Sequence, residues 1–475
     1  MFILHIALQG CLRGARVPYG ITPDTGGHIR YLLGLVAAAD GHPDVTRQEI
    51  VVRRFRDERL GCEYAGAGER ISSKSRIVRL WGRSPDYRSK EEMGAEIDAL
   101  WGSLQQYLSR LDRLPDVIHA HYADAGNLAR MARKRFGIPF IFTGHSLGRV
   151  KRIADPSTAA DPVLAARIEV EDAVIREADV IVSSSRDEAE GQYGLYPTAN
   201  AVRIRINPPG CNLARFGTTT TGDAGRRLIE PHLDHSERPP ILAISRPVRK
   251  KNLQGLLDAY ASDARLRDGA NLVIFAGNHE REEDLDAEAR DVLANLRRTI
   301  AEHGLEGRVA LPPAHDPRDV PSIYRYAAER GGVFANVALN EPFGLTFLEA
   351  AASGVPVVAT ESGGPVDIVG RCRNGHLVDP CDQEAIAGAL AHLLGDHEVW
   401  TAAAANGLRE ARYYDWERHV RQYLPDVANL AARSRAAAVT AERPLVAPTR
   451  EIRLSPARGF VASARAVRPD RSERT

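Results

Sequence analysis

Short apolar runs alternate with helix-like segments along this chain, and the alternation occurs twice. The first set lies at 2–8, 77–80, 117–120, 139–142 and 180–183, and the second lies at 241–245, 272–276, 309–311, 333–338, 357–359 and 375–378. Short buried strands that alternate with helices form a parallel sheet covered on both faces. The sequence therefore predicts an α/β protein with two doubly wound, Rossmann-like domains that face each other across a cleft. Ligands of such domains bind at the carboxyl ends of the strands.

The domain boundaries follow from chain length and from changes in composition. At 475 residues the chain is too long for one domain and long enough for two cores. We expect a first domain at 1–217, a linker at 218–240 and a second domain at 241–410. The segment 411–430 should form a helix that crosses back to the first domain. Residues 431–475 hold ten arginines and four acidic residues, which predicts a disordered basic tail. Its partner stays unknown, and RNA, acidic lipid and an acidic protein are all compatible with its charge.

The composition of the whole chain argues against several classes of function. The formal net charge is +1, which indicates no nucleic-acid partner. No apolar run approaches the length needed to span a membrane. The first residues, MFILHIALQG, lack a basic region before the apolar run and indicate a first strand instead of a signal peptide. The five cysteines are scattered without metal-binding spacing, which suits the cytoplasm.

Two strand-to-helix turns lie close together between 333 and 369. Gly344 is at the turn into one predicted helix, 345–352, and Gly363-Gly364-Pro365 opens another. Helix starts present unpaired backbone N–H groups and a positive end, which suit a diphosphate. Glu341 and Glu349 bracket seven residues, and a carboxylate can hold two sugar hydroxyls. By spacing alone two solvated glutamates are the simpler interpretation, but the glycine-rich turns favour a functional one.

Other polar groups follow the predicted strands. The segment DTGGH at 24–28 has two glycines that let a ligand approach the backbone, although simple turn chemistry explains it equally well. A G-x-G-x-x-G motif is missing there, which argues against a nicotinamide enzyme. His145 follows a strand, and Arg246 and Lys251 follow the first strand of the second domain. Lys90, Lys151 and Arg167 add cations that could bind a phosphate or form a solvated basic surface.

These segments together resemble the family 4 retaining glycosyltransferases of the GT-B fold, and more narrowly the sucrose-phosphate synthase and sucrose synthase group. The matching segments are DTGGH at 24–28, HYADAG at 121–126, TGHSLGRVK at 143–151, RPVRKKN at 246–252, NEPFGLTFLEA at 340–350 and ATESGGPVDIV at 359–369. They occur in the family's order between about residues 3 and 430. The tail has no counterpart in the resemblance, and no phosphatase domain is expected.

The resemblance implies a catalytic set. His145 would contact the donor hexose near the reacting centre, Arg246 and Lys251 would hold the diphosphate, and Glu341 would contact the hexose hydroxyls. Glu349 would bind the ribose of the donor. The rest of the implied donor site consists of Gly27 and the backbone N–H groups of Phe343, Gly344, Leu345 and Thr346.

The resemblance also implies an acceptor site. Lys90 and Lys151 match basic positions that hold the acceptor phosphate in sucrose-phosphate synthases, and Arg167 is a looser match. His28 stands where the family usually has a glutamine that helps to hold the acceptor sugar. Neutral histidine keeps one donor and one acceptor, and it titrates near neutral pH, so His28 could strengthen binding of a phosphate as the pH falls.

The resemblance thus implies a hexosyltransferase that moves glucose from UDP-glucose to fructose 6-phosphate, with no cofactor and no metal. Three alternatives stay open. The first is an enzyme of the same fold with another donor or acceptor, such as a mannosylfructose-phosphate synthase using GDP-mannose or a sucrose synthase using free fructose. The second is a lipid or cell-wall glycosyltransferase at a membrane surface. The third is a nucleotide-sugar sensor that binds without turnover, against which the complete catalytic set argues.

Overall fold

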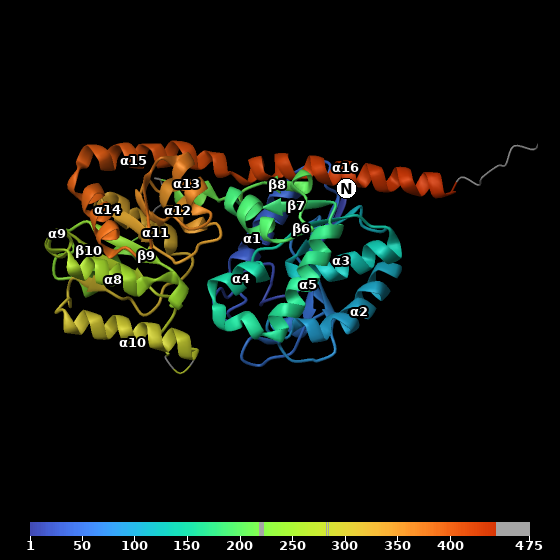
Figure 1. Cartoon of the computed structure of the whole chain (residues 1–475), viewed down its shortest axis with the longest axis horizontal. Helices are drawn as coiled ribbons and strands as arrows, with labels where there is room; N and C mark the ends of the chain where they lie inside the picture. Colours follow the sequence, from blue (N-terminus) through green and yellow to red (C-terminus); the bar gives the residue numbers. More distant parts are fainter. Residues whose placement is uncertain (218–222, 282, 284, 443–475) are drawn as a thin grey trace, which may run out of the picture. The chain divides into compact units, whose positions relative to one another are not determined.

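The computed structural model describes residues 1–217, 223–281, 283 and 285–442 (Figure 1). One set of strands forms an eight-stranded sheet in the order β3-β4-β2-β1-β5-β6-β7-β8. All neighbouring strands are parallel except β3 and β4. Its strands are β1 (Phe2–Ala7), β2 (Arg47–Arg54), β3 (Gly68–Arg70), β4 (Ser75–Trp81), β5 (Val117–His121), β6 (Phe140–Thr143), β7 (Val180–Ser183) and β8 (Ile204–Ile206).

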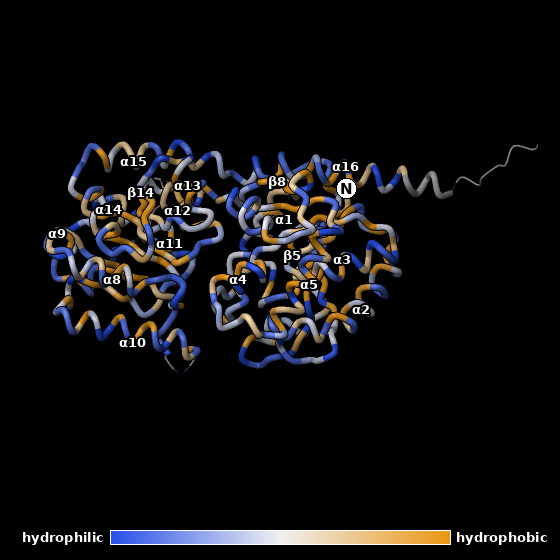
Figure 2. The backbone as a smooth tube through the Cα atoms, in the orientation of Figure 1, coloured by the Kyte–Doolittle hydropathy of each residue, from blue (hydrophilic) through white to orange (hydrophobic). Residues whose placement is uncertain are grey.

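The second sheet has six strands in the order β11-β10-β9-β12-β13-β14, and all its pairs are parallel. Its strands are β9 (Pro240–Ile244), β10 (Asn271–Phe275), β11 (Val309–Ala310), β12 (Val333–Asn336), β13 (Val357–Thr360) and β14 (Gly375–Val378). The expectation of two parallel-sheet α/β domains is therefore confirmed. Figure 2 shows the apolar strands in orange inside helices whose outer faces are blue, the pattern of sheets buried on both faces.

Helices connect the parallel strands. Those of the first domain are α1 (Gly27–Asp40), α2 (Ile97–Ser109), α3 (Tyr122–Phe136), α4 (Gly148–Ala154) and α5 (Pro162–Glu177). Those that follow are α6 (Leu213–Phe216), α7 (Ala224–Ile229), α8 (Leu253–Ser262), α9 (Ala264–Gly269), α10 (Ala287–Glu302), α11 (Val320–Glu329), α12 (Leu345–Ala352), α13 (Pro365–Cys372), α14 (Gln383–Gly395), α15 (His397–Glu410) and α16 (Trp416–Glu442). No helix among the described residues is long and apolar enough to span a membrane.

The segment expected to be a linker, 218–240, is in part a packed element, which corrects that expectation. Helix α7 lies within it, and Ile229 is buried in the core of the second domain together with Phe216. The hydroxyl of Ser353 donates to the carbonyl of Phe216 at 3.1 Å. The apolar side chains thus attach the connection to the second core, a preference that a Thr- and Gly-rich sequence conceals. Residues 218–222 lie outside the described part of the chain.

Helix α16 corrects the expected start of the tail. It continues to Glu442, so the part of the expected disordered tail at 431–442 is helical, and 443–475 lie outside the described residues. The alanine-rich sequence there has high helix propensity, whereas the prediction of disorder was based on the arginine content. Before residue 431 the helix buries Tyr423 and Val427 against Ile3 and Ile141 of the first sheet.

Both sheets have a strand at which the strand order reverses direction. In the first sheet β1 has β2 on one side and β5 on the other, and in the second β9 lies between β10 and β12. At such a point the loops after two adjacent strands leave toward opposite faces of the sheet, and a crevice opens between them at the carboxyl edge. The segments that follow β1, β9 and β12 carry most of the predicted site residues.

Candidate functional site

Lys251 and Glu341 form an ion pair at the carboxyl edge of the second sheet. Lys251 follows β9 and donates from Nζ to Oε2 of Glu341, which follows β12. Asn336 at the end of β12 lies 3.4 Å from the same oxygen. Burial raises the pKa of the Glu341 carboxyl, but Lys251 and Asn336 outweigh burial and leave it below the usual value. Glu341 is therefore held ionised, as an acceptor of hydroxyl hydrogen bonds.

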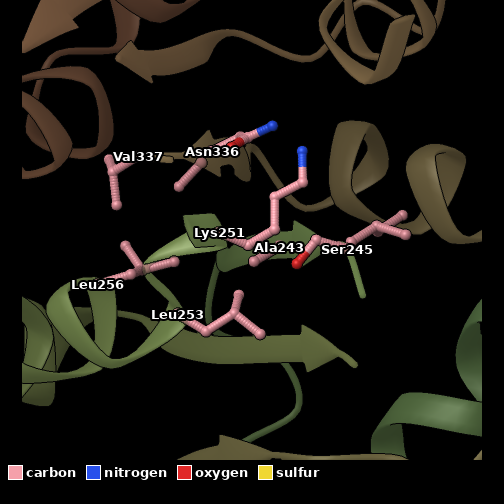
Figure 3. Close-up of a pocket in the computed structure, with 9 residues that line it drawn as sticks. Ala243, Ser245, Lys251, Leu253, Leu256, Asn336 and Val337 are labelled. Carbon is pink, nitrogen blue, oxygen red and sulfur yellow. The ribbon is translucent and has the colours of Figure 1, made fainter. Parts of the chain in front are cut away.

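The loop that carries Glu341 is tied to the next strand-to-helix turn. The backbone N–H of Glu341 donates to the Ser362 carbonyl at 3.2 Å, and the Glu341 carbonyl accepts from the N–H of Gly364 at 2.9 Å. Figure 3 shows Lys251 extending toward Asn336 over a small cavity, which is also lined by Ser245 and Leu256. The two turns predicted from the sequence thus lie side by side.

The start of helix α12 requires glycine at 344. Gly344 has φ +93°, and a Cβ there would lie 2.4 Å from Cδ2 of Phe347. The helix begins at Leu345, with the bounds that the sequence predicted. Phe343 is buried, and the Thr346 carbonyl accepts from the Tyr324 hydroxyl at 3.1 Å. The N–H of Phe347 donates to the Gly344 carbonyl at 3.0 Å, and the N–H groups of Leu345 and Thr346 come before the first intrahelical hydrogen bond, so they can bind an anion.

Arg246 extends from the second domain to the first. Its Nη1 donates to the carbonyl of Pro23 at 3.1 Å. The neighbouring Lys250, which sequence reasoning did not select, has its pKa lowered by burial and by Arg246 and Lys251. The three cations therefore stand close together, which is unfavourable unless an anion binds there. The only sequence signal for Lys250 was its position in the run 249–251.

Glu349 is almost fully buried and pairs with a residue that the sequence did not indicate. Its Oε1 lies 2.6 Å from Nη2 of Arg30 on α1, and its side chain is 2% exposed. Burial raises the pKa of the Glu349 carboxyl, while Arg30 and Arg215 oppose that rise. No motif marked Arg30, because its role depends on a contact between the two domains.

His28 and His145 lie together at the carboxyl edge of the first sheet, with ring centroids 5.9 Å apart. His28 is buried, and its Nε2 lies 3.3 Å from the carbonyl of Gln9. Burial lowers its pKa to about 4. The expectation that His28 titrates near neutral pH is therefore wrong for this structure, because burial penalises the imidazolium. Beside it, a Cβ at Gly27 would meet nothing within 4 Å, so the helix start faces open space.

His145 has a strained backbone, with φ +56°. Its Nε2 lies 2.9 Å from Nδ1 of His121, and its ring packs beside Tyr31 and Tyr122. Burial lowers its pKa well below the usual value. A non-glycine residue in the left-handed region persists only where neighbours hold it, and such residues cluster at functional sites.

Lys90 and Lys151 come together around one carboxylate. Nζ of each lies 3.7 Å from Oε1 of Glu91, and Lys90 also lies 3.5 Å from Asp24. Arg167 has other partners: its Nε donates to Glu171 at 2.8 Å, and its Nη2 donates to the Ser146 carbonyl. The structure thus brings the two lysines together, whereas Arg167 is held next to His145.

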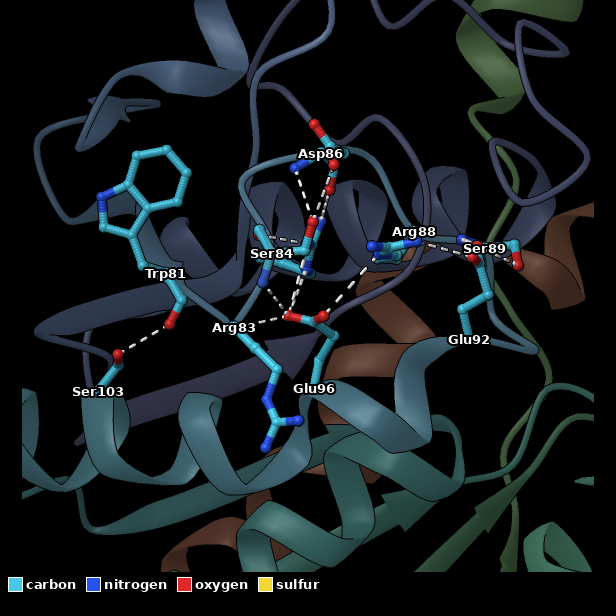
Figure 4. A network of polar contacts seen from close by, with 10 residues as sticks. Trp81, Arg83, Ser84, Asp86, Arg88, Ser89, Glu92, Glu96 and Ser103 are labelled. Carbon is cyan, nitrogen blue, oxygen red and sulfur yellow. Dashed lines mark hydrogen bonds and ion pairs between the residues drawn. The ribbon is translucent and has the colours of Figure 1, made fainter.

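A buried carboxylate fixes the segment that leads to Lys90 (Figure 4). Oε2 of Glu96 accepts from the N–H of Arg83 at 2.7 Å and from that of Ser84 at 3.2 Å. Arg53 lies 3.5 Å from the same oxygen and donates to the carbonyl of Ser84 at 2.7 Å. Sequence reasoning missed this network, because its members are far apart in the chain.

Comparison with known proteins agrees with this arrangement. Residues 26–210 match the model of the glycosyl transferase 4-like domain, and residues 226–409 match that of glycosyl transferases group 1. A probable sucrose-phosphate synthase of Oryza sativa subsp. indica is 33% identical over 91% of this chain and 47% of the relative. The sucrose-phosphate synthase of Zea mays is 33% identical over 91% of this chain and 48% of the relative. The chain spans about half the length of these curated relatives.

Solved structures show the same fold. A sucrose-phosphate synthase from Thermosynechococcus elongatus superposes with a TM-score of 0.74 at 24% identity, over 91% of this chain and 99% of that one. The catalytic domain of starch synthase IV from Arabidopsis thaliana, bound to ADP and acarbose, superposes with a TM-score of 0.66 at 16% identity, over 91% and 99%. The two domains therefore form a GT-B fold, and the chain belongs to the glycosyltransferase family that these two domain models describe.

Proposed function

We propose that this chain is a retaining glycosyltransferase that moves glucose from UDP-glucose to fructose 6-phosphate and gives sucrose 6-phosphate. The observation that carries the proposal is the presence of two pairs of cationic side chains, one from each domain. Arg246 and Lys251 lie at the edge of the second sheet, and Lys90 and Lys151 share Glu91 in the first domain. A diphosphate donor and a phosphorylated acceptor each require such charges. The similarity to proteins named sucrose-phosphate synthase supports this choice of substrates.

The donor half of the reaction uses the second domain. Arg246 and Lys251 stabilise the diphosphate as it leaves, because fixed cations cost no reorganisation when negative charge develops. Glu341, kept ionised by Lys251, accepts hydrogen bonds from the hexose hydroxyls. Glu349 accepts from the ribose, as the resemblance implies, and Glu349→Ala should raise the KM for the donor.

The transfer itself occurs on one face of the hexose. The bond from the anomeric carbon to the diphosphate oxygen breaks, and a bond to the fructose 6-phosphate hydroxyl forms on the same face. A diphosphate oxygen takes the proton of that hydroxyl. The centre passes through an oxocarbenium-like state, no protein carboxylate acts as nucleophile, and the anomeric configuration is retained.

We propose that this reaction requires no cofactor and no metal ion. Arg246, Lys251 and the positive start of α12 supply the charge that a divalent ion supplies in other transferases. The Asp-x-Asp sequence at 284–286 is a poor ion site, because the Asp286 carboxylate accepts from the N–H of Ala289 at 2.8 Å as the N-cap of α10. Asp284 lies outside the described residues.

A second candidate is a transferase of the same fold with another donor or acceptor. His28, in place of the family's glutamine, is the observation that favours it, because it changes the reach of a group at the acceptor position. GDP-mannose as donor and free fructose as acceptor are the two substitutions to consider.

A substrate panel tests the proposal. UDP-glucose, ADP-glucose, GDP-glucose and GDP-mannose are each incubated with fructose 6-phosphate, with fructose and with no acceptor, while nucleotide release is measured. UDP-glucose with fructose 6-phosphate should react fastest, and NMR of the product should show a retained anomeric configuration. Preference for GDP-mannose or for free fructose would establish the second candidate. Nucleotide binding without release in any mixture would indicate a sensor instead of an enzyme.

A further inference from the structure

A cluster of histidines lies behind the carboxyl edge of the first sheet. His5 on β1 and His119 and His121 on β5 are fully buried, and one ring nitrogen from each lies within 4.8 Å of the others. His119 uses both of its nitrogens: Nδ1 lies 3.1 Å from the Tyr423 hydroxyl, and Nε2 lies 2.9 Å from Oγ1 of Thr143. His119 therefore has no lone pair to spare for a metal ion, and we interpret the cluster as a hydrogen-bonded one.

One hydrogen bond connects this cluster to the candidate site. Nδ1 of His121 lies 2.9 Å from Nε2 of His145, so one of the two rings donates and the other accepts. The other nitrogen of His121, Nε2, is buried and has no hydrogen-bond partner among the described residues. Burial lowers the pKa of both rings well below the usual value, so each is neutral and carries a single proton.

The buried Nε2 of His121 decides which ring donates. If His145 donated, His121 would carry its proton at Nε2, as an N–H without a partner in the core. If His121 donates from Nδ1, its Nε2 is a bare lone pair. Among buried backbone groups, orphaned N–H donors are rarer than under-satisfied acceptors, and we extend this preference to the imidazole ring. The hydrogen-bonding balance therefore favours His121 as the donor.

We propose that His121 is a positioning residue that fixes His145 as its neutral Nδ1–H tautomer. His145 then accepts through Nε2 and presents Nδ1–H as a hydrogen-bond donor, and it cannot act as a base through Nε2. The same bond helps to hold the left-handed backbone of His145. The use of this donor toward a hexose hydroxyl rests on the proposed function, whereas the tautomer itself does not.

The tautomer is measured directly in the free protein. Histidine labelled with ¹⁵N is introduced, long-range ¹H–¹⁵N correlations are recorded at pH 7.5, and the signals are assigned with the His145→Gln and His121→Asn variants. His145 should carry its proton on Nδ1, with Nε2 in the range of an unprotonated, hydrogen-bonded nitrogen. A proton on Nε2 of His145, or on both of its nitrogens, would overturn the proposal.

Two substitutions separate positioning from simple packing. His121→Asn keeps an N–H close to the place of Nδ1, whereas His121→Leu removes it. We expect His121→Leu to lower kcat by about tenfold, the worth of one hydrogen bond, with the acceptor KM unchanged. His121→Asn should recover most of that loss and keep the His145 tautomer.

The same substitution within the cluster supplies a matched control. His5→Leu removes another buried ring that has no hydrogen bond to His145, so it should leave the His145 tautomer and kcat close to those of the parent. Melting temperatures establish that each variant is folded. Equal kcat values for His121→Asn and His121→Leu would refute the positioning role. If no sugar nucleotide is turned over, the proposed function fails, while the NMR result still decides the tautomer.

Discussion

The guanidinium of Arg30 lies 2.6 Å from the carboxylate of Glu349, and this ion pair joins helix α1 of the first domain to helix α12 of the second. The two side chains differ in exposure, at 40% for Arg30 and 2% for Glu349. A carboxylate buried to this degree is costly unless it is paired. Arg30 therefore opposes protonation of the proposed ribose-binding group, whose pKa burial raises, and it does so across the domain boundary.

We predict that Arg30→Met destabilises the protein by about 1–3 kcal/mol at pH 8, because a buried carboxylate loses its partner. Burial raises the pKa of Glu349, so without Arg30 the folded state takes up a proton more readily than the unfolded state. The deficit should therefore shrink as the pH falls through the raised pKa. Urea unfolding at pH 8 and pH 5.5 measures this difference.

The double variant Arg30→Met/Glu349→Gln is the control for that prediction. It removes the charge along with its partner, so its stability at pH 8 should exceed that of Arg30→Met. A double variant no more stable than Arg30→Met would show that the cost comes from lost packing instead of from an unpaired charge.

For the acceptor, we predict that Lys151→Ala raises the KM for fructose 6-phosphate by about tenfold and changes the donor KM little. Lys151 and Lys90 lie 3.7 Å from the same Glu91 oxygen, so a phosphate that replaces Glu91 gains two cations. Initial rates with each substrate varied in turn provide the values. Lys134→Ala, on an exposed turn of α3, is the matched control. A selective rise in the donor KM would place the acceptor elsewhere.

The buried network around Glu96 leads to a prediction about the segment that carries Lys90. Glu96→Gln keeps the shape of the side chain but leaves the buried Arg53 without a counter-charge, at a cost of about 1–3 kcal/mol. Since Glu96 also accepts from the N–H groups of Arg83 and Ser84, the KM for fructose 6-phosphate should rise more than the KM for UDP-glucose.

Unfolding curves and kinetics of the Glu96 variant are compared with those of Glu92→Gln. Glu92 lies on the same segment, but its side chain is 49% exposed and pairs with Arg88 at 3.0 Å, so its loss should have little effect. Equal effects of the two substitutions would mean that the buried network does not position Lys90.

The sequence predicted those features that depend only on residues close together in the chain. Helix α12 has the predicted bounds because residue 344 has a left-handed backbone conformation, which favours glycine and marks the start of the helix. Strand β2 was missed, because its sequence RQEIVVRR surrounds three apolar residues with charges. Glu49 in that strand is buried and pairs with Arg76 of β4 at 2.5 Å.

That pairing depends on a neighbouring strand, so no pattern within β2 could reveal it. The ion pair of Arg30 and Glu349 escaped prediction for the same reason, since it depends on a contact between domains. By contrast, Lys251 and Glu341 each follow a strand of one sheet, and the convergence of parallel strand ends brings them together.

On metal dependence, we predict that activity with UDP-glucose and fructose 6-phosphate survives removal of divalent ions. Arg246 and Lys251 neutralise the leaving diphosphate. An excess of EDTA, about 5 mM, should therefore lower kcat by less than about twofold. Removing one cation should cost much more: Lys251→Met should lower kcat by about a hundredfold, because it also releases Glu341. Loss of activity in EDTA with recovery on adding magnesium or manganese would contradict this prediction.

We predict that ionisation of His28 does not affect acceptor binding between pH 6 and pH 8. The pKa of His28 is lowered to about 4, chiefly by burial, which the Gln9 carbonyl and Asp24 oppose and to which Lys90 adds. Because the folded-state pKa lies below the usual 6.5, the ring stays neutral between pH 8 and pH 6, and protonation cannot strengthen acceptor binding in that range. The KM for fructose 6-phosphate should therefore follow only the second ionisation of the phosphate. His28→Gln should keep the same pH profile, since the glutamine amide does not titrate and, like neutral histidine, offers both a donor and an acceptor group. His28→Ala should raise the KM at every pH by a similar factor, because it removes both groups.

Measuring the acceptor KM from pH 6 to pH 8 for the parent and both variants decides the matter. An improvement in affinity toward pH 6 that the parent shows and His28→Gln lacks would mean that the bound phosphate raises the pKa of His28 enough to overcome its burial.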